Sequence, residues 1–166
     1  MRPTLITLLL ASLCCALSAN SVLAQTAVPA TTPATPQVPS GPPSADEAAL
    51  LQVFGMRPGL GSLATDFVQR LRGDARTRPI FADSKMKPAY LASQLADQFC
   101  RLLNGPCTYD GETMKTAHAE SAIARKDFLV AVELLQQAMD AQAIPFAAQN
   151  RLLALLAPMH RDIVNH

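Results

Sequence analysis

Apolar residues recur every three or four positions in several stretches of this chain, which is the spacing of one face of an α-helix. No stretch alternates apolar and polar residues convincingly, as a half-buried strand does. The pattern therefore predicts an all-α fold. The positions that carry it are Leu60, Leu63, Ala64, Phe67, Val68 and Leu71 in one stretch, Leu91, Leu95, Phe99 and Leu102 in another, and Phe128, Val132, Leu135 and Met139 in a third.

Glycine and proline residues set the expected boundaries of the first two helices. A first helix over residues 46–54 should end at Gly55, because glycine is favoured just past a helix end. Pro58 and Gly59 should then form the corner before the second helix.

Four later positions divide the rest of the chain. Pro79 should force the chain out of helix just before Ile80 and Phe81, because proline disfavours helical backbone in the residue before it. The Gly-Pro pair at 105–106 should stop the next long helix. Pro145 suits the first turn of the last helix, and Pro158 should kink that helix near its end.

Residues 1–24 have the features of a secretory signal peptide. Arg2 gives a basic start, an apolar run of about a dozen residues follows, and cleavage is expected after Ala24. The run is shorter than the roughly 18 residues of a membrane span, so we expect no membrane association after cleavage, with an uncleaved anchor as the alternative. Cys14 and Cys15 should be removed with the signal. We therefore expect an exported protein, periplasmic in location.

Residues 25–45 are rich in proline, alanine and threonine and carry no charge. They show no helical or strand periodicity, which predicts a disordered linker. Such a linker is either a passive tether or a segment that binds a partner, and no recognition motif favours the second. The remaining residues, 46–166, suffice for one compact domain.

Charge gives no indication of a nucleic-acid partner. The chain has 14 basic and 13 acidic residues, and removal of Arg2 with the signal leaves 14 − 1 = 13 basic residues against 13 acidic ones. No basic block with interleaved aromatic residues is present. We therefore expect no binding to nucleic acid.

Two cysteines remain after the expected cleavage, Cys100 and Cys107, on either side of the predicted helix stop. In an oxidising compartment we expect them to form a disulfide, worth roughly 2 to 3 kcal/mol for a loop of this size. A structural zinc site is the competing interpretation, but two cysteines without further nearby ligands cannot complete one.

His118 is the single histidine in the body of the predicted domain, since His160 and His166 lie at or near the carboxyl terminus. A neutral imidazole can bind iron through one ring nitrogen while a partner fixes the other. A solitary histidine is nevertheless more often a surface or satisfied core residue than a ligand. Spacing alone leaves both interpretations open.

Several short motifs occur in the order and at the spacings of a known family. They are FGMRPGL at 54–60, DF at 66–67, PIF at 79–81, DQF at 97–99, NGP at 104–106, YDG at 109–111, MKTAH at 114–118, KDF at 126–128 and LALLAP at 153–158. As an ordered set they resemble the group I truncated haemoglobins. The resemblance implies a two-over-two helical sandwich around haem b, with His118 as the proximal iron ligand.

The resemblance also assigns the walls of the haem pocket. One wall is expected from Leu91, Leu95 and Phe99, and the other from Met114, Ile123 and Phe128. Phe81 should stack against the ring where the chain turns. Each of these apolar residues could equally be ordinary core, and Phe81 is the strongest assignment because it follows the turn at Pro79.

The distal side departs from the family. Many members have a tyrosine directly after the residue matching Phe67 and a glutamine at the position of Leu95, whereas this chain has Val68 and Leu95 there. Bound oxygen then loses a charge-assisted hydrogen bond of about 1.5 to 3 kcal/mol. Gln94 and Tyr90 are the nearby polar candidates for a donor, although a solvated position suits both.

Other departures concern the loops. Met56 replaces the second glycine of a Gly-Gly pair, and residues 120–122 replace glycines that follow the proximal histidine in the family. Ala124 stands at a helix-capping position, which should cost about 1 kcal/mol relative to serine or threonine.

These features predict a haem protein that reversibly binds a diatomic gas: oxygen, nitric oxide or carbon monoxide. An electron donor would be a further partner if the protein has a redox activity such as nitric oxide dioxygenation. A helical interaction module that has lost haem is an alternative from another class. A peroxidase-like enzyme is a third, but no distal histidine–arginine pair is visible for it.

Overall fold

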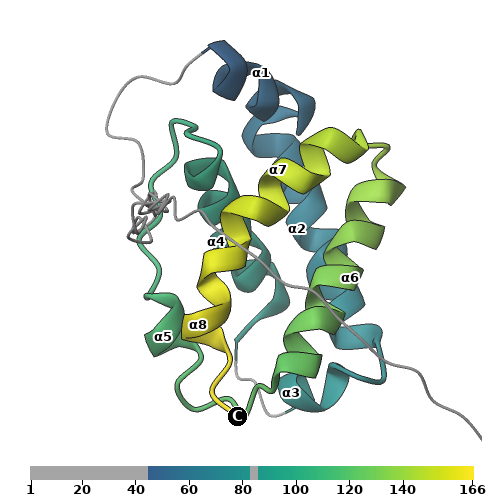
Figure 1. Ribbon diagram of the computed structural model, residues 1–166, viewed down its shortest axis with the longest axis vertical. Coiled ribbons are helices and arrows are strands. Elements are labelled where there is room, and N and C mark those ends of the chain that lie inside the picture. The colour runs from purple at the N-terminus through teal and green to yellow at the C-terminus, as the bar shows by residue number, and fades with distance from the viewer. Residues whose placement is uncertain (1–44, 83–85) are drawn as a thin grey trace, which may run out of the picture. The chain divides into compact units, whose positions relative to one another are not determined.

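The computed structural model describes residues 45–82 and 86–166, all within one compact unit (Figure 1). The predicted signal peptide and residues 25–44 of the predicted linker lie outside this range. The described residues form helices and no strands, so the all-α prediction is confirmed. The helices are α1 (Ala45–Val53), α2 (Met56–Gly73), α3 (Arg78–Ala82), α4 (Pro88–Leu102), α5 (Met114–Ala117), α6 (Arg125–Ala141), α7 (Phe146–Leu156), the 3-10 helix η1 (Ala157–Met159) and α8 (His160–Ile163).

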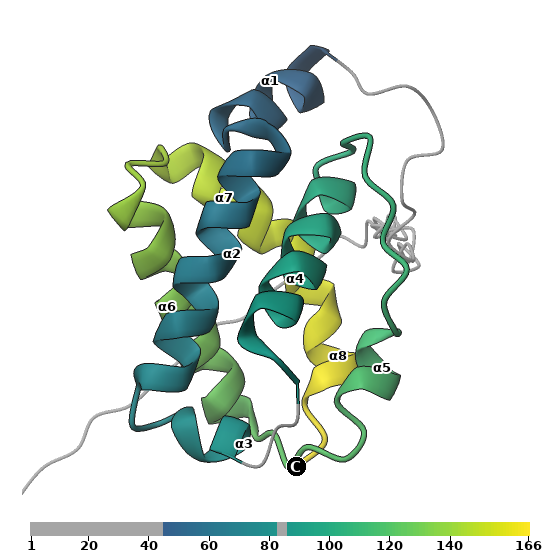
Figure 2. The same cartoon turned by 180° about the vertical axis from the view of Figure 1, so that it is seen from behind.

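The four long helices form two antiparallel pairs. α2 packs against α4, and α6 packs against α7, with further contacts of α2 with α6 and of α4 with α7. The colour gradient in Figure 1 shows that the partners in each pair run in opposite directions, and Figure 2 shows α2 and α4 in front of the other pair. The two-over-two arrangement is therefore confirmed.

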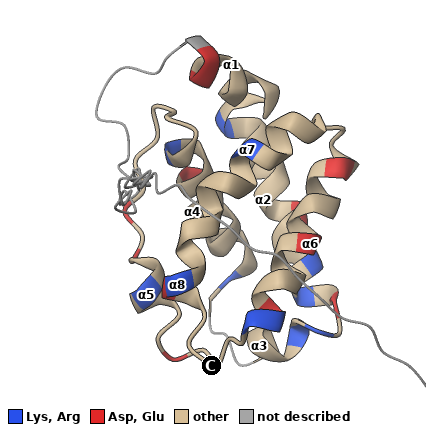
Figure 3. Cartoon of the chain, viewed as in Figure 1, with Lys and Arg blue, Asp and Glu red and all other residues tan. Residues whose placement is uncertain are grey.

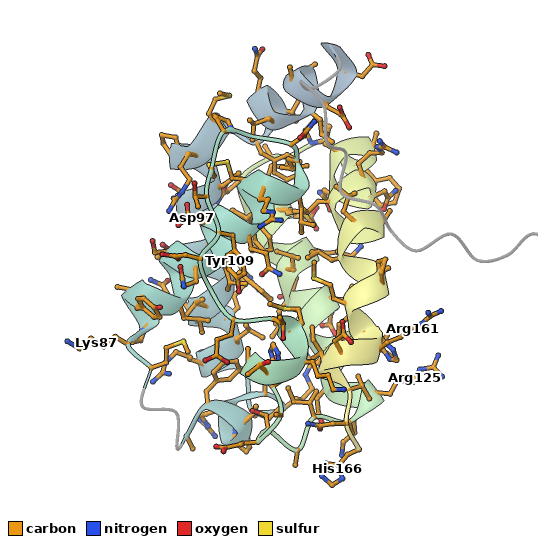
Figure 4. The ribbon with its side chains drawn as sticks, turned by 90° about the vertical axis from the view of Figure 1, so that its left-hand side faces the viewer. Lys87, Asp97, Tyr109, Arg125, Arg161 and His166 are labelled. Carbon is orange, nitrogen blue, oxygen red and sulfur yellow. A yellow bond between two sulfur atoms is a disulfide. The ribbon has the colours of Figure 1, made fainter. Side chains whose placement is uncertain are left out.

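The core lies where the apolar faces of these four helices meet. The six periodic positions predicted for α2 are all buried, as are Phe99 on α4, Leu135 and Met139 on α6, and Leu152 on α7. An ion pair between Arg57 and Asp97 joins α2 to α4 at the edge of this core (Figure 4). None of the described helices is both long enough and apolar enough to span a membrane.

The first helix forms as predicted, but the corner that follows it lies earlier than Pro58 and Gly59. The chain turns at Gly55 and Met56, whose φ angles are 73° and 57°, and Pro58 and Gly59 belong to the first turn of α2. Proline is tolerated there because its missing N–H has no partner in a first turn. A Cβ on Gly59 would lie 2.1 Å from the Phe54 carbonyl oxygen, so glycine is required by close packing.

Pro79 does not force the chain out of helix, so that prediction was wrong. It is the second residue of α3, and Ile80 and Phe81 follow within the same short helix. The reason is the same as at Pro58, since the first turn of a helix needs no N–H from residue 79. Pro145 directly precedes α7, and at Pro158 the α-helix gives way to η1, as the predicted kink requires.

A polar cluster fixes the corner between α2 and α3. The Arg76 guanidinium donates to Asp74 at 2.8 Å and to Glu133 of α6 at 2.9 Å. The hydrogen bonds that the Asp74 carboxyl accepts from the side chain and from the backbone amide of Arg76 lower its pKa from 3.8 to about 2. The neighbouring Thr77 hydroxyl is buried and donates to the Leu71 carbonyl at 2.7 Å. The corner is thereby tied both to α2 and to α6.

Cys100 and Cys107 form the predicted disulfide. It joins the end of α4 to the loop that leads to α5. Asn104, with a φ of 56°, reverses the chain, and the Gly105 amide donates to the Cys100 carbonyl at 2.8 Å. A Cβ on Gly105 would lie 2.6 Å from the Cys100 sulfur, so this turn admits only glycine without rearrangement.

Candidate functional site

An apolar cavity of about 400 Å³ lies between the helices. This is within the range of about 300 to 1,000 Å³ that is usual for small-molecule sites. Its lining combines α2, α3, α4 and α6 with the chain's carboxyl-terminal helices. The lining residues are Phe67, Leu71, Thr77, Ile80, Phe81, Leu91, Leu95, Gln98, Phe99, Met114, His118, Ser121, Ile123, Asp127, Phe128, Ala131, Val132, Leu135, Leu153, Leu156, Ala157, Met159 and Ile163.

The structure brings together at this cavity every residue that the sequence predicted for the pocket walls. The set is Phe81, Leu91, Leu95, Phe99, Met114, His118, Ile123 and Phe128. They come from α3, α4, α5, α6 and the loop before α6, so no single helix makes the site. Separate elements of the chain therefore converge on one apolar space that also holds the expected histidine.

His118 is half-buried and follows the last residue of α5. Thr113 caps the start of this short helix, and its hydroxyl oxygen accepts from the Thr116 amide at 3.2 Å. The His118 ring nitrogen Nδ1 lies 2.8 Å from the Met114 carbonyl oxygen. Because a carbonyl only accepts, Nδ1 must carry the proton, and in the neutral ring the lone pair is then on Nε2. The local fold thus leaves His118 with one nitrogen free to bind a metal.

Of the adjacent residues Phe67 and Val68 on α2, only Phe67 lines the cavity. Phe67 and Leu71, four positions apart, share the cavity face. Val68 is buried at 1% exposure but borders a different hollow, between α2 and α4, together with Ala92. One residue along a helix corresponds to a rotation of about 100°, which is enough to direct the next side chain elsewhere.

On α4, Leu95 lines the cavity, whereas Gln94 does not. The Gln94 amide donates to the Tyr90 hydroxyl at 3.1 Å, and Tyr90 is 56% exposed. The two polar residues considered as distal donors therefore bond to each other on the outer face of α4. Phe67 and Leu95 present only hydrocarbon to the cavity.

Gln98 is a lining residue that sequence reasoning missed. It is buried, and its amide nitrogen lies 3.4 Å from the sulfur atoms of both Met114 and Met159. Thioether sulfur is a weak acceptor, so this amide has poor hydrogen-bond partners. The spacing of Leu91, Leu95 and Gln98 at four and three positions is helical and could have identified it.

Two further polar lining residues, Thr77 and Asp127, form hydrogen bonds with the protein's own backbone. Thr77 bonds to Leu71 as described above. The Asp127 carboxylate accepts from the Ala124 amide at 2.9 Å, at the start of α6. Ala124 has no side-chain oxygen for capping, as predicted. Asp127, three residues further on, instead accepts a hydrogen bond from the backbone N–H of Ala124 at the start of the helix.

Comparison with known proteins agrees with this arrangement. The bacterial-like globin family profile matches residues 50–165. Among solved structures, the Fe(III) form of the truncated haemoglobin from Tetrahymena pyriformis is similar at 19% identity, with a TM-score of 0.65, over 70% of this chain and 98% of that one. Two single-residue variants of that protein match at 20% identity with the same TM-score and the same coverage.

A search of curated protein sequences found no significant match. The family profile nevertheless spans nearly the whole described domain, including α2, α4, α6, α7 and His118. The helical order and the two antiparallel pairs match the truncated-haemoglobin fold. The chain therefore belongs to the bacterial-like globin family.

Proposed function

We propose that this protein is an exported group I truncated haemoglobin that holds haem b in the apolar cavity, with His118 as the proximal ligand, and reversibly binds a diatomic gas. The family implies haem and a gas ligand. The observation that carries the residue assignment is His118 at the cavity wall, with Nδ1 fixed on the Met114 carbonyl.

The residues of the cavity fit a porphyrin. When bound, haem supplies an iron with one coordination position for a histidine and another for a small gas. The Met114 carbonyl holds the His118 ring in the tautomer that a metal requires and raises the basicity of Nε2. The nearly continuous hydrocarbon lining excludes water and favours a large, flat, apolar group.

The gas-binding side is proposed to be formed by Phe67 and Leu95. Neither side chain can donate a hydrogen bond, so oxygen gains no charge-assisted stabilisation from them, a loss of about 1.5 to 3 kcal/mol. Carbon monoxide and nitric oxide depend less on such a donor. We therefore expect weak oxygen binding relative to these gases.

Basic residues on the elements around the cavity are candidates to bind the two carboxylates of haem b. Figure 3 shows Lys and Arg positions on α5, on α8 and at the start of α6, and each of these three helices also supplies lining residues to the cavity. Lys115 lies on α5, Arg161 on α8 and Arg125 at the start of α6. We propose that this basic region receives the carboxylate edge.

Export to the periplasm is proposed for the mature domain. The basic and apolar pattern of residues 1–24 supports it, and a disulfide is typical of an oxidising compartment. An electron donor that keeps the iron ferrous is a further proposed partner. Nitric oxide dioxygenation would be the redox activity of the same site.

The test is a haem titration of the purified domain and of two histidine variants. The unaltered protein and His160→Ala should each take up one haem and give a histidine-ligated spectrum. His118→Ala should lose stable binding. His160 is a matched control because it packs against a lining residue without lining the cavity itself. The ring centroids of His160 and Phe128 are 5.0 Å apart.

Absence of haem uptake by the unaltered, folded protein would reject the proposal and favour a helical interaction module. If all three proteins gave the same histidine-ligated spectrum, the assignment of His118 as the ligand would be rejected, and haem binding itself would stand. Gas binding is then measured on the ferrous protein, where reversible spectral changes with carbon monoxide and oxygen are expected.

A further inference from the structure

The carboxyl-terminal residues form hydrogen bonds to the loop that follows His118. The Asn165 side-chain nitrogen Nδ2 donates to the His118 carbonyl oxygen at 2.8 Å, and its Oδ1 accepts from the Ile123 amide at 3.0 Å. The backbone amides of Asn165 and His166 donate to the Ile123 carbonyl at 3.1 and 3.2 Å. One asparagine thus spans the loop and contacts both of its ends.

Both ends of that loop line the cavity, at His118 and Ile123. Within the loop, the Ser121 amide donates to the His118 carbonyl at 3.0 Å, and the Ile123 amide lies 2.8 Å from the Ser121 carbonyl. The His118 carbonyl therefore accepts from two donors, one local and one 47 residues away. These bonds define the backbone conformation directly after the histidine.

The segment that carries Asn165 is itself held in place. α8 packs against α5, and Ile163 at its end lines the cavity. The Val164 amide donates to the His160 carbonyl at 3.0 Å, so the helical bonding reaches the residue directly before Asn165. Figure 4 shows His166 at the end of the molecule beyond Arg161, where the chain leaves α8. Asn165 is thereby presented from a fixed helix and not from a free tail.

We propose that Asn165 is a positioning residue for His118, an inference that rests on the proposed function. The Met114 carbonyl fixes the imidazole from the amino-terminal side, and Asn165 fixes the His118 backbone from the carboxyl-terminal side. Side-chain direction follows backbone geometry, so the two constraints together set how the ring faces the cavity. The bonds within the loop run from the Ser121 amide to the His118 carbonyl and from the Ile123 amide to the Ser121 carbonyl, so Asn165 supplies the restraint from outside the loop that joins its two ends.

Two substitutions separate the two halves of the asparagine amide. Asn165→Asp keeps the oxygen that accepts from the Ile123 amide. It replaces the nitrogen that donates to His118 by a second carboxylate oxygen, which would face the His118 carbonyl oxygen and cannot donate to it. Asn165→Ala removes both side-chain bonds. Asn150→Asp makes the same charge change on an exposed residue of α7 and is the matched control. Purification tags belong at the amino terminus, since an extension after His166 would disturb the segment.

The first readout is amide hydrogen exchange of Ile123 in the haem-free protein. We expect exchange about three- to tenfold faster in Asn165→Ala, the effect of one lost hydrogen bond, with Asn165→Asp and Asn150→Asp close to the unaltered protein. Melting temperatures verify that all variants fold. Unchanged exchange in folded Asn165→Ala would overturn the proposal without reference to haem.

The second readout is the iron–histidine stretching band in the resonance Raman spectrum of the ferrous haem protein. Both Asn165 variants should shift or broaden this band and lose haem about three- to tenfold faster, whereas Asn150→Asp should match the unaltered protein. A merely structural role would lower the melting temperature and leave the band unchanged, which overturns the proposal. If the unaltered protein has no such band, the proposed function fails and this inference fails with it.

Discussion

A tyrosine introduced at Phe67 should slow oxygen release, whereas one at the adjacent Val68 should not. Phe67 lines the cavity and Val68 borders a separate hollow between α2 and α4. Phe67→Tyr therefore adds a hydroxyl donor on the proposed gas-binding side. A charge-assisted bond of about 1.5 kcal/mol corresponds to roughly a tenfold slower dissociation of oxygen. Carbon monoxide dissociation should change much less.

Val68→Tyr is the matched control because it adds the same hydroxyphenyl group one position away. Val68 is 1% exposed, so the larger side chain overpacks the α2–α4 interface. We expect a stability loss of about 1 to 3 kcal/mol and no slowing of oxygen release.

Stopped-flow mixing of the oxygenated ferrous protein with carbon monoxide measures the oxygen dissociation rate, and thermal unfolding measures stability. The opposite result would be slower oxygen release in Val68→Tyr with an unchanged rate in Phe67→Tyr. That result would place residue 68, and not residue 67, on the gas-binding side.

Three further predictions concern stability. Replacing both Cys100 and Cys107 by serine should lower the free energy of unfolding by about 2 kcal/mol, as the loop-entropy relation gives for a loop of this length. Thiol titration of the unaltered protein, denatured without reductant, should detect no free thiol from this pair. Met56→Gly should stabilise by about 0.5 to 1 kcal/mol in denaturant melts, because Met56 has a φ of 57° and is 42% exposed. The pKa of Asp74 is lowered from 3.8 to about 2, so the ionised carboxylate stabilises the folded protein. This stabilisation is fully present above pH 4 and is lost as the pH falls towards 2. Asp74→Asn should remove that part of the acid sensitivity, and an unchanged acid profile would contradict the assignment.

The apolar periodicity predicted the helices, and the family resemblance then assigned positions on their apolar faces to the cavity wall. Leu91, Leu95 and Phe99 recur at helical spacing, and such residues must share a face whatever that face contacts. The pattern could not tell Phe67 from Val68, since both are buried and face different spaces. Gln94 was a candidate distal donor, but it lies outside the cavity lining, whereas the next residue, Leu95, lines the cavity.

Other features depend on contacts between distant residues. The bond from Asn165 to His118 joins positions 47 residues apart, and no local spacing indicates it. Proline interrupts a helix in its interior but is tolerated in its first turn. The sequence did not indicate that α3 begins one residue before Pro79, so Pro79 was interpreted as a helix breaker. The Arg76 contact with Glu133 likewise follows from the packing of α2 on α6 and not from the sequence around either residue.

The central claim is that His118 binds the iron of a haem held in the cavity, and imidazole complementation of His118→Gly tests it most directly. The glycine variant removes the ring and leaves space beside Met114. We predict that His118→Gly lacks the histidine-type ferrous spectrum and regains it when free imidazole is added. A histidine-type spectrum in His118→Gly without imidazole, or no response to imidazole in a folded haem-containing variant, would contradict the account.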